Sequence, residues 1–321
     1  MRAVVPGFRM SPREHPVRTP RRLLFFPALA LIVLTGLAAC APLRVLNALA
    51  SANGGHRVTP GVAYGPLARQ VLDVYTPAAA APPAGWPVVV FFYGGSWNDG
   101  ERSDYAFVGA ALAARGVLTL VADYRLYPEV RYPEFLQDSA LALGWGFDHA
   151  ARLGGDPKRV FVMGHSAGGY NAAMIALDPR WLAPSARSPN ELAGWIGLAG
   201  PYDFFPMENL QAQPVFFHPR YPAKSQPIEF ADVRAVPTFL GAPSQDRLVD
   251  PARNTQALAA KLKAAGTPVT LRMYEKASHA TLVGAFALPL RWLAPVLDDV
   301  STFIATTPPA AARRAGPVAT P

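Results

Sequence analysis

The sequence around Ser166 has the residue types and the spacing of a serine nucleophile on a sharp turn. A Gly-x-Ser-x-Gly pattern occupies residues 164–168, between an apolar run at 160–163, typical of a buried strand, and residues 170–177, which predict a helix. Side chains two residues before and after such a serine would collide, so both positions favour glycine. The turn would raise the Ser166 hydroxyl above the sheet, at the N-terminal end of the helix. The alternative interpretation is a structural glycine turn.

A serine hydroxyl near neutral pH needs a base within hydrogen-bond reach and a third group that orients the base. The chain has six histidines. His279 directly follows the last predicted strand, at the edge of an open α/β sheet where sites form. The other five fall in the leader, before the domain, on a predicted helix, beside the serine and in an irregular segment. His279 is therefore the predicted base.

The acid of such a site is expected between the serine and the histidine in chain order. Asp246 follows the apolar run at residues 236–241 and is the predicted acid. Asp250 precedes Pro251 at the start of a predicted helix, which is typical of a helix N-cap. Asp203 also ends a predicted strand and is the weaker candidate for the acid. The favoured interpretation is that it forms part of the pocket wall.

Acyl transfer also requires hydrogen-bond donors for the developing oxyanion. The backbone N–H of Ala167, directly after the serine, is one candidate. A second glycine-rich turn follows an earlier predicted strand, and there Gly94, Gly95 and Ser96 would let the backbone approach a ligand closely. The alternative is a tight turn without this role.

The order of the predicted elements indicates the fold class. Apolar runs alternate with helical patterns, which predicts an α/β fold with a mostly parallel, doubly wound sheet in a single domain. Residues 180–234 are rich in proline and irregular, and we expect them to form a small lid over the site. The predicted strands are residues 71–75, 88–93, 117–122, 160–163, 195–198, 236–241 and 269–274, and the predicted helices are 105–115, 135–153, 170–177, 251–265 and 285–306.

The N-terminal residues have the layout of a secretory signal, a basic stretch followed by an apolar segment at residues 23–39. A membrane-spanning anchor is the alternative, at the lower limit of length. The segment ends in Leu-Ala-Ala-Cys, which resembles the lipobox of bacterial lipoproteins, where the signal is cut before a lipid-bearing cysteine. Cys40 is the only cysteine in the chain, so no disulfide can form, and a lone buried thiol is the other interpretation.

These features predict four parts: a signal at residues 1–39, a tether at 40–59, the catalytic domain at 60–306 and a disordered tail at 307–321. The resemblance to lipoproteins implies a cell-envelope protein anchored by lipid on Cys40, with its domain outside the cytoplasm. In lipoproteins that this segment resembles, a residue other than aspartate after the cysteine favours the outer membrane over the inner membrane, and here that residue is Ala41.

The net charge of +8 is concentrated in the leader, because residues 1–39 hold six arginines and one glutamate. The rest of the chain has no basic run, which argues against nucleic-acid binding. Hydrophobic residues make up 51% and charged residues 16%, enough for a sizeable core. No histidine or cysteine cluster has metal-ligand spacing and no phosphate-binding loop occurs, so we expect no metal or cofactor.

Taken together, these motifs resemble the α/β-hydrolase superfamily over about residues 60–305. The closer likeness is to its esterase branch around hormone-sensitive lipase, small carboxylesterases and arylformamidases. That branch usually has histidine before the glycine pair, whereas this chain has Tyr93, which leaves open what supports the loop. The motifs are Gly-Gly-Ser-Trp (94–97), Asp-Tyr-Arg-Leu (123–126), Gly-Gly-Asp-Pro (154–157), Gly-His-Ser-Ala-Gly-Gly (164–169), the Asp246 loop and His279.

The resemblance implies a serine hydrolase that cleaves carboxylic esters with small or medium acyl groups through Ser166, Asp246 and His279. An amidase or arylformamidase is one alternative, since the same three groups serve amides. A non-catalytic envelope protein with the hydrolase fold is the other, although such proteins usually lack one of the three residues. The sequence leaves the oligomeric state open.

Overall fold

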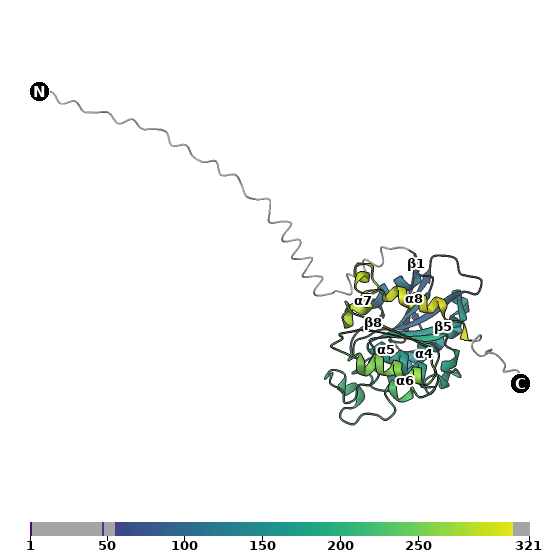
Figure 1. Ribbon diagram of the computed structural model, residues 1–321. Helices are drawn as coiled ribbons and strands as arrows, with labels where there is room; N and C mark the ends of the chain where they lie inside the picture. The colour runs from purple at the N-terminus through teal and green to yellow at the C-terminus, as the bar shows by residue number, and fades with distance from the viewer. Residues whose placement is uncertain (2–46, 48–54, 311–321) are drawn as a thin grey trace. The chain divides into compact units, whose positions relative to one another are not determined.

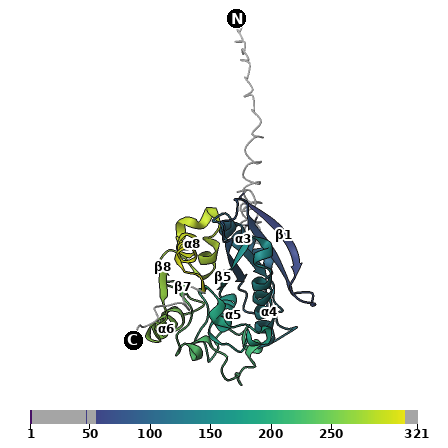
Figure 2. The same cartoon turned by 90° about the vertical axis from the view of Figure 1, so that its right-hand side faces the viewer.

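The fold is built on one eight-stranded sheet. The structure is a computed structural model that describes residues 1, 47 and 55–310, and the sheet and its helices lie within residues 55–310 (Figure 1). The order across the sheet is β1-β2-β4-β3-β5-β6-β7-β8, with β1 and β8 at opposite edges (Figure 2). The strands are β1 (His56–Ala63), β2 (Val71–Pro77), β3 (Trp86–Phe92), β4 (Leu118–Ala122), β5 (Gly155–His165), β6 (Gly194–Leu198), β7 (Thr238–Pro243) and β8 (Val269–Tyr274).

The pairing makes the sheet mostly parallel, as predicted. β2 runs antiparallel to both β1 and β4, and every other neighbouring pair is parallel. The central strands are apolar on both faces because helices cover both sides of the sheet. In β3, for example, Val90 lies opposite Leu120 of β4 on one side and Val162 of β5 on the other, and all three are fully buried. The carboxyl ends of these strands therefore meet at one edge.

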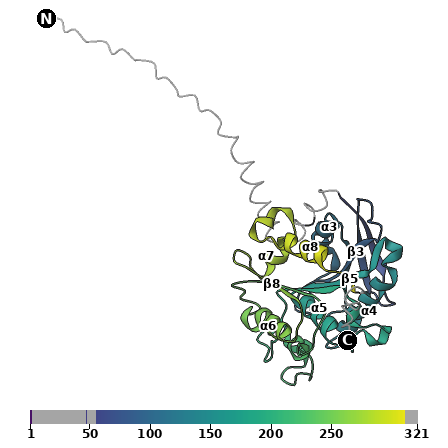
Figure 3. The ribbon, with the colours of Figure 1, turned by 45° about the vertical axis from the view of Figure 1, so that its right-hand side comes forward.

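Helices pack against both faces of the sheet. α3 (Ala106–Ala113) and α8 (Val296–Thr306) lie on one face, and α5 (Ala167–Leu177) and α6 (Ala257–Ala264) lie on the other (Figure 3). α4 (Glu134–His149) packs beside α5. Every residue of α5 is buried, which explains its run of small and apolar residues after Ser166. Among residues 55–310, we find no helix with the length and apolar character needed to cross a bilayer.

The seven predicted strands are confirmed, but the structure adds an eighth. β1 begins at His56, inside the segment predicted as a tether at residues 40–59. Most of its side chains are exposed, so the sequence lacks the apolar alternation by which a half-buried strand is recognised. The domain therefore starts earlier than the predicted boundary at residue 60.

The predicted C-terminal helix at residues 285–306 is wrong as a single element. Over these residues the structure has a 3₁₀ helix η8 (Leu288–Leu293) and α8, and a separate short helix, α7 (His279–Gly284), precedes them. Pro289 lies in the first turn of η8 and Pro295 directly precedes α8. Proline lacks the backbone N–H and clashes with the preceding turn, so a regular helix is kinked or broken at such positions.

The predicted tail also begins too early, because Thr307 and Ala310 are buried. Residues 311–321 lie outside the described part of the chain. So do the predicted signal (apart from residue 1), its apolar segment and Cys40.

The other predicted helices are confirmed with small changes at their ends. The pattern at residues 105–115 comprises the end of η1 (Arg102–Tyr105) and α3, and that at 135–153 comprises α4 and η2 (Ala151–Leu153). The helix at residues 251–265 starts as a π-helical turn, η7 (Ala252–Gln256), before α6. The irregular segment contains η3 (Ala183–Ser185) and η4 (Pro189–Glu191) before β6, and η5 (Gln213–Phe216) and η6 (Pro227–Phe230) after it.

Candidate active site

Ser166 lies at the turn between β5 and α5. Its backbone has φ 54° and ψ −122°, a strained conformation for a residue with a side chain. A Cβ atom at Gly164 would lie 2.0 Å from the carbonyl oxygen of Gly168, and one at Gly168 would lie 2.0 Å from that of Phe92. Both glycines are thus required by the close approach of backbone to backbone, as the motif predicts.

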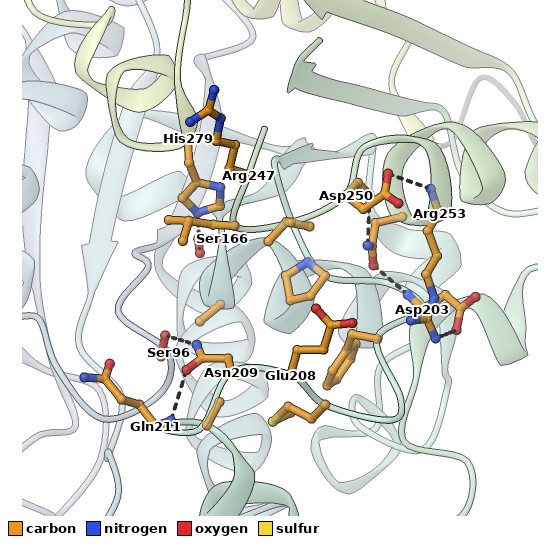
Figure 4. A pocket seen from close by; sticks show the side chains of 18 of the residues that line it. Ser96, Ser166, Asp203, Glu208, Asn209, Gln211, Arg247, Asp250, Arg253 and His279 are labelled. Carbon is orange, nitrogen blue, oxygen red and sulfur yellow. Dashed lines mark hydrogen bonds and ion pairs between the residues drawn. The ribbon is translucent and has the colours of Figure 1, made fainter. Parts of the chain in front are cut away.

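His279 lies within hydrogen-bond distance of Ser166 although the two residues are 113 positions apart in the sequence. His279 is the first residue of α7, after the N-cap Ser278. Its Nε2 is 2.8 Å from Ser166 Oγ and its Nδ1 is 2.7 Å from Asp246 Oδ2 (Figure 4 shows the histidine above the serine). An ionised carboxylate only accepts hydrogen bonds, so Nδ1 carries the proton and Nε2 is left to accept from the serine hydroxyl. This is the arrangement that a base and its orienting acid require.

Asp246 is held in the loop after β7 by three donors. Besides His279, the backbone N–H groups of Leu248 and Val249 donate to its Oδ1 at 2.9 and 3.2 Å. Burial acts to raise the pKa of Asp246, but the hydrogen bonds and the neighbouring imidazole outweigh it, and the pKa lies below its ordinary value. The carboxylate therefore stays ionised beside His279.

The two rival carboxylates occupy other places. Asp250 Oδ1 accepts from the backbone N–H of Ala252 at 2.8 Å, the hydrogen bond of a helix cap. Asp203 forms an ion pair with Arg253 at 3.2 Å and lies on the pocket wall. Neither contacts His279 in the structure.

The turn after β3 lies against the nucleophile. A Cβ atom at Gly94 would come within 2.9 Å of the Cβ of Ser166. Gly95 has φ +130° and its carbonyl accepts from the N–H groups of Asn98 and Asp99 at 3.0 Å, which closes the turn. Ser96 follows with φ 52°. Ala167 is the first residue of α5, where backbone N–H groups have no partner within the helix.

Tyr93, which stands where the esterase branch usually has histidine, lies in a buried polar network. Its Oη accepts from Arg69 Nη2 at 2.7 Å and donates to Asp123 Oδ1 at 2.8 Å. Arg102 donates to the same carboxylate through its backbone and its guanidinium. The Tyr93 ring is stacked on Tyr124 at 4.9 Å, and the Tyr124 hydroxyl donates to the Tyr93 carbonyl. The network supports the backbone directly before Gly94 and Gly95.

His165 has a role that the sequence did not reveal. Its Nε2 lies 3.0 Å from the carbonyl oxygen of His279, so Nε2 is the donor in this hydrogen bond. Burial, with a further contribution from His279, lowers the pKa of His165 to about 3. It is therefore a neutral donor that holds the backbone of the candidate base. No signal in the sequence pairs these two positions, which lie 114 residues apart.

A pocket with a volume of about 630 Å³ opens over Ser166 and His279. The segment after β6 forms one of its walls, in agreement with the predicted lid position (Figure 4). Asn254 fixes the start of this segment, because its Oδ1 accepts from the N–H groups of Tyr202 and Asp203 at 2.6 and 2.9 Å. Wall residues that sequence reasoning missed include Phe204, Met207, Glu208 and Asn209. Irregular proline-rich sequence carries no period from which their direction could be predicted.

Within the described residues, no group of three or more histidine, cysteine or acidic side chains is arranged to hold a metal ion.

Comparison with known families identifies the domain. A family model described as BD-FAE matches residues 72–262, more than half of the chain. The chain belongs to the BD-FAE family. The match includes Ser166, Asp246 and the Gly94–Gly95 turn and ends before His279.

Curated relatives of this BD-FAE chain are esterases by name. The carboxylesterase NlhH of Mycobacterium tuberculosis (strain ATCC 25618 / H37Rv) is 45% identical over 92 residues, 28% of each chain. The probable isoprenylcysteine alpha-carbonyl methylesterase ICME of Oryza sativa subsp. japonica is 32% identical over 160 residues, 48% of this chain and 37% of that protein. The chain thus spans about a third of the length of these relatives.

Solved structures confirm the α/β-hydrolase fold of the BD-FAE chain. Esterase 2 of Thermogutta terrifontis, with butyrate bound, aligns with a TM-score of 0.63 at 23% identity, over 78% of this chain and 94% of that one. The esterase of Pyrobaculum calidifontis aligns with a TM-score of 0.65 at 22% identity, over 82% and 89% of the two chains. The fold predicted from the sequence motifs is therefore the fold of this protein.

Proposed function

We propose that the protein is a serine hydrolase that cleaves carboxylic esters of small or medium acyl groups. The observation that carries the proposal is the continuous hydrogen-bonded series from Asp246 through His279 to Ser166 Oγ, with distances of 2.7 and 2.8 Å. The series opens into a pocket large enough for a small ester. The names of the curated relatives support the same class of reaction.

In the first half of the reaction, Ser166 Oγ attacks the ester carbonyl carbon while His279 Nε2 takes the hydroxyl proton. The carbonyl oxygen becomes an oxyanion, to which the backbone N–H groups of Gly95, Ser96 and Ala167 donate hydrogen bonds, with Gly94 allowing the turn to approach closely. Collapse of this intermediate breaks the bond to the alcohol oxygen, which leaves with the proton from His279. The acyl group stays on Ser166.

In the second half, His279 Nε2 removes a proton from water, and the resulting oxygen nucleophile attacks the acyl carbon. The second tetrahedral intermediate collapses, the acid is released, and Ser166 Oγ recovers its proton from His279. Asp246 remains ionised throughout and stabilises the imidazolium that forms twice in each turnover.

The decisive test is Ser166→Ala, assayed with p-nitrophenyl acetate and butyrate and with a fluorophosphonate probe that labels activated serines. We expect loss of both turnover and labelling, because only the Oγ bears the acyl or phosphonyl group. Ser185→Ala, at an exposed position outside the pocket, serves as the matched control and should leave both unchanged. Turnover that survives Ser166→Ala would refute the assignment.

Two alternatives are separated by the same reagents. A non-catalytic protein with this fold would fail to react with the probe even as wild type. An amidase or formamidase would react with it but would prefer anilides or formamides to the matching esters. We favour ester cleavage over amide cleavage because the curated relatives described above are named as esterases.

We also propose that the protein works in a bacterial cell envelope, lipid-anchored through Cys40, with the outer membrane favoured over the inner membrane. The basic stretch, the apolar segment at residues 23–39 and the Leu-Ala-Ala-Cys ending support this. The partners would then be a membrane and a small ester outside the cytoplasm.

A further inference from the structure

The side chain of Ser96 is held in the pocket by an amide from the opposite wall. Asn209 Nδ2 donates to Ser96 Oγ at 3.0 Å, and the backbone N–H of Gln211 donates to Asn209 Oδ1 at 3.0 Å (Figure 4). A backbone N–H can only donate, so it fixes which end of the amide is oxygen. The nitrogen of Asn209 must therefore face Ser96.

The direction of this hydrogen bond determines what the Ser96 hydroxyl can do. A hydroxyl has one proton and two lone pairs. Because Asn209 donates to one lone pair, the proton of Ser96 is left for another acceptor, and no other partner of Ser96 Oγ is found among the described residues. The residue is half-buried and lines the same pocket as Ser166, Ala167 and His279.

The turn that carries this hydroxyl lies against the nucleophile. Gly94, two residues earlier, is packed against Ser166, and Ser96 has the left-handed backbone that the close turn imposes. A second hydrogen bond joins the same two walls, since Asn98 Nδ2 donates to the carbonyl of Gln211 at 3.1 Å. The turn after β3 and the segment around Asn209 are thus linked twice in the free protein, so the hydroxyl is oriented before substrate arrives.

We propose that the Ser96 side-chain hydroxyl is a donor of the oxyanion hole, added to the backbone donors, and that Asn209 is a positioning residue that fixes its direction. This rests on the proposed ester hydrolysis. As Ser166 Oγ bonds to the carbonyl carbon, the carbonyl π electrons move onto oxygen, and the Ser96 O–H donates a hydrogen bond to that oxygen. The Ser96 proton stays on Ser96 Oγ while the Ser166 proton passes to His279, and the Ser96 hydrogen bond weakens when the carbonyl re-forms.

Removing the hydroxyl tests the first part. We expect Ser96→Ala to lower kcat by roughly 10- to 100-fold, with KM changed less than about threefold, because the donor acts on charge that exists only in the transition state. Ser96→Gly separates this from backbone strain, since glycine adopts positive φ readily. Both variants should lose activity if the hydroxyl matters. Recovery of wild-type kcat by Ser96→Gly, or a kcat of Ser96→Ala within about twofold of wild type, would overturn the proposal.

Reversing the hydrogen bond tests the second part. Asn209→Ala frees the hydroxyl to rotate and should cost kcat less than Ser96→Ala does. Asn209→Asp presents an ionised acceptor, so the Ser96 proton would turn toward residue 209, and kcat should fall about as far as in Ser96→Ala. When Asn209→Asp is added to Ser96→Ala, kcat should then fall by less than about threefold relative to Ser96→Ala alone. An equal loss with and without the Ser96 hydroxyl would mean that the new charge acts directly, and would refute the positioning role.

The result also separates this proposal from the broader one. If Ser166→Ala abolishes turnover but Ser96→Ala leaves it unchanged, only the donor role of the Ser96 hydroxyl is overturned. A wild-type protein that neither hydrolyses p-nitrophenyl acetate nor reacts with fluorophosphonate would overturn both. Thermal unfolding of each variant shows whether it is folded as the wild type is.

Discussion

The hydroxyl of Tyr93 donates a 2.8 Å hydrogen bond to the carboxylate of Asp123, and Arg69 donates to the same hydroxyl at 2.7 Å. This arrangement explains how the turn after β3 is supported without the usual histidine. Burial, followed by the neighbouring Tyr124 and Asp123, raises the pKa of Tyr93 far above its ordinary value. The phenol therefore remains protonated, and a donor, at neutral pH.

Tyr93→Phe should weaken both the turn and the activity. Removing the Tyr93 hydroxyl leaves the buried Asp123 and the half-buried Arg69 short of one partner each, so we expect the free energy of unfolding to fall by about 1–3 kcal/mol. We expect kcat to fall roughly tenfold, because donors displaced by a fraction of an ångström fit the oxyanion less well. Urea denaturation and p-nitrophenyl ester kinetics measure the two effects.

Tyr127→Phe is the matched control for that variant. We find no hydrogen bond to its hydroxyl among the described residues, so the same atom is removed without disturbing the network. Equal behaviour of the two variants would show that the Tyr93 hydroxyl does not support the turn.

Asp246→Asn and Asp250→Asn should differ sharply, although the two residues are four positions apart. An amide at position 246 no longer holds the imidazole in the required tautomer, and kcat should fall by about 10⁴-fold. Asparagine is as good a helix cap as aspartate, so Asp250→Asn should be nearly neutral, while Asp250→Ala should cost about 1 kcal/mol of stability. Steady-state kinetics and thermal unfolding distinguish these outcomes. Strong inactivation by Asp250→Asn would show that the assignment of the acid is wrong.

His165 should make stability depend on pH. Its pKa is about 3 in the folded protein, below the ordinary value of 6.5, so between these values the unfolded chain binds a proton that the folded one does not. Stability is therefore lost as the pH falls from about 6.5 toward 3. His165→Gln keeps a donor for the His279 carbonyl but cannot titrate. As the pH falls, the free energy of unfolding of this variant should therefore decrease less steeply than that of the wild type. The two slopes should differ by the uptake of up to about one proton on unfolding.

Urea denaturation at a series of pH values measures the two slopes. If wild type and His165→Gln have the same slope below pH 6.5, the buried neutral state of His165 is disproved.

Cys40→Ser should move the protein out of the membrane fraction, because the proposed thioether to lipid cannot form on a hydroxyl under the same processing. Immunoblots of membrane and soluble fractions give the distribution, and esterase assay of each fraction shows that the domain itself is intact. Fractionation like that of the wild type would argue against lipidation.

The site shows where local sequence is informative and where it is not. The turn at Ser166 could be predicted because its glycines are required by contacts within a few residues and with the adjacent strand. That Asp246 and His279 lie near Ser166 could be predicted because parallel strands bring their carboxyl ends to one edge. The distances that join them, 2.7 and 2.8 Å, follow only from the packed structure.

By itself the sequence determined the alternation of buried strands and helices, because periodicity and buried apolar runs are local properties. It missed β1, whose exposed edge carries no such pattern, and it missed the breaks in the C-terminal helix although two prolines stand there. Only the tertiary structure decided that Tyr93 meets Asp123, that His165 holds His279 and that Asn209 reaches Ser96. These partners lie 30 to 114 residues apart, and side-chain hydrogen bonds over such separations depend on how the chain is packed rather than on any spacing along it.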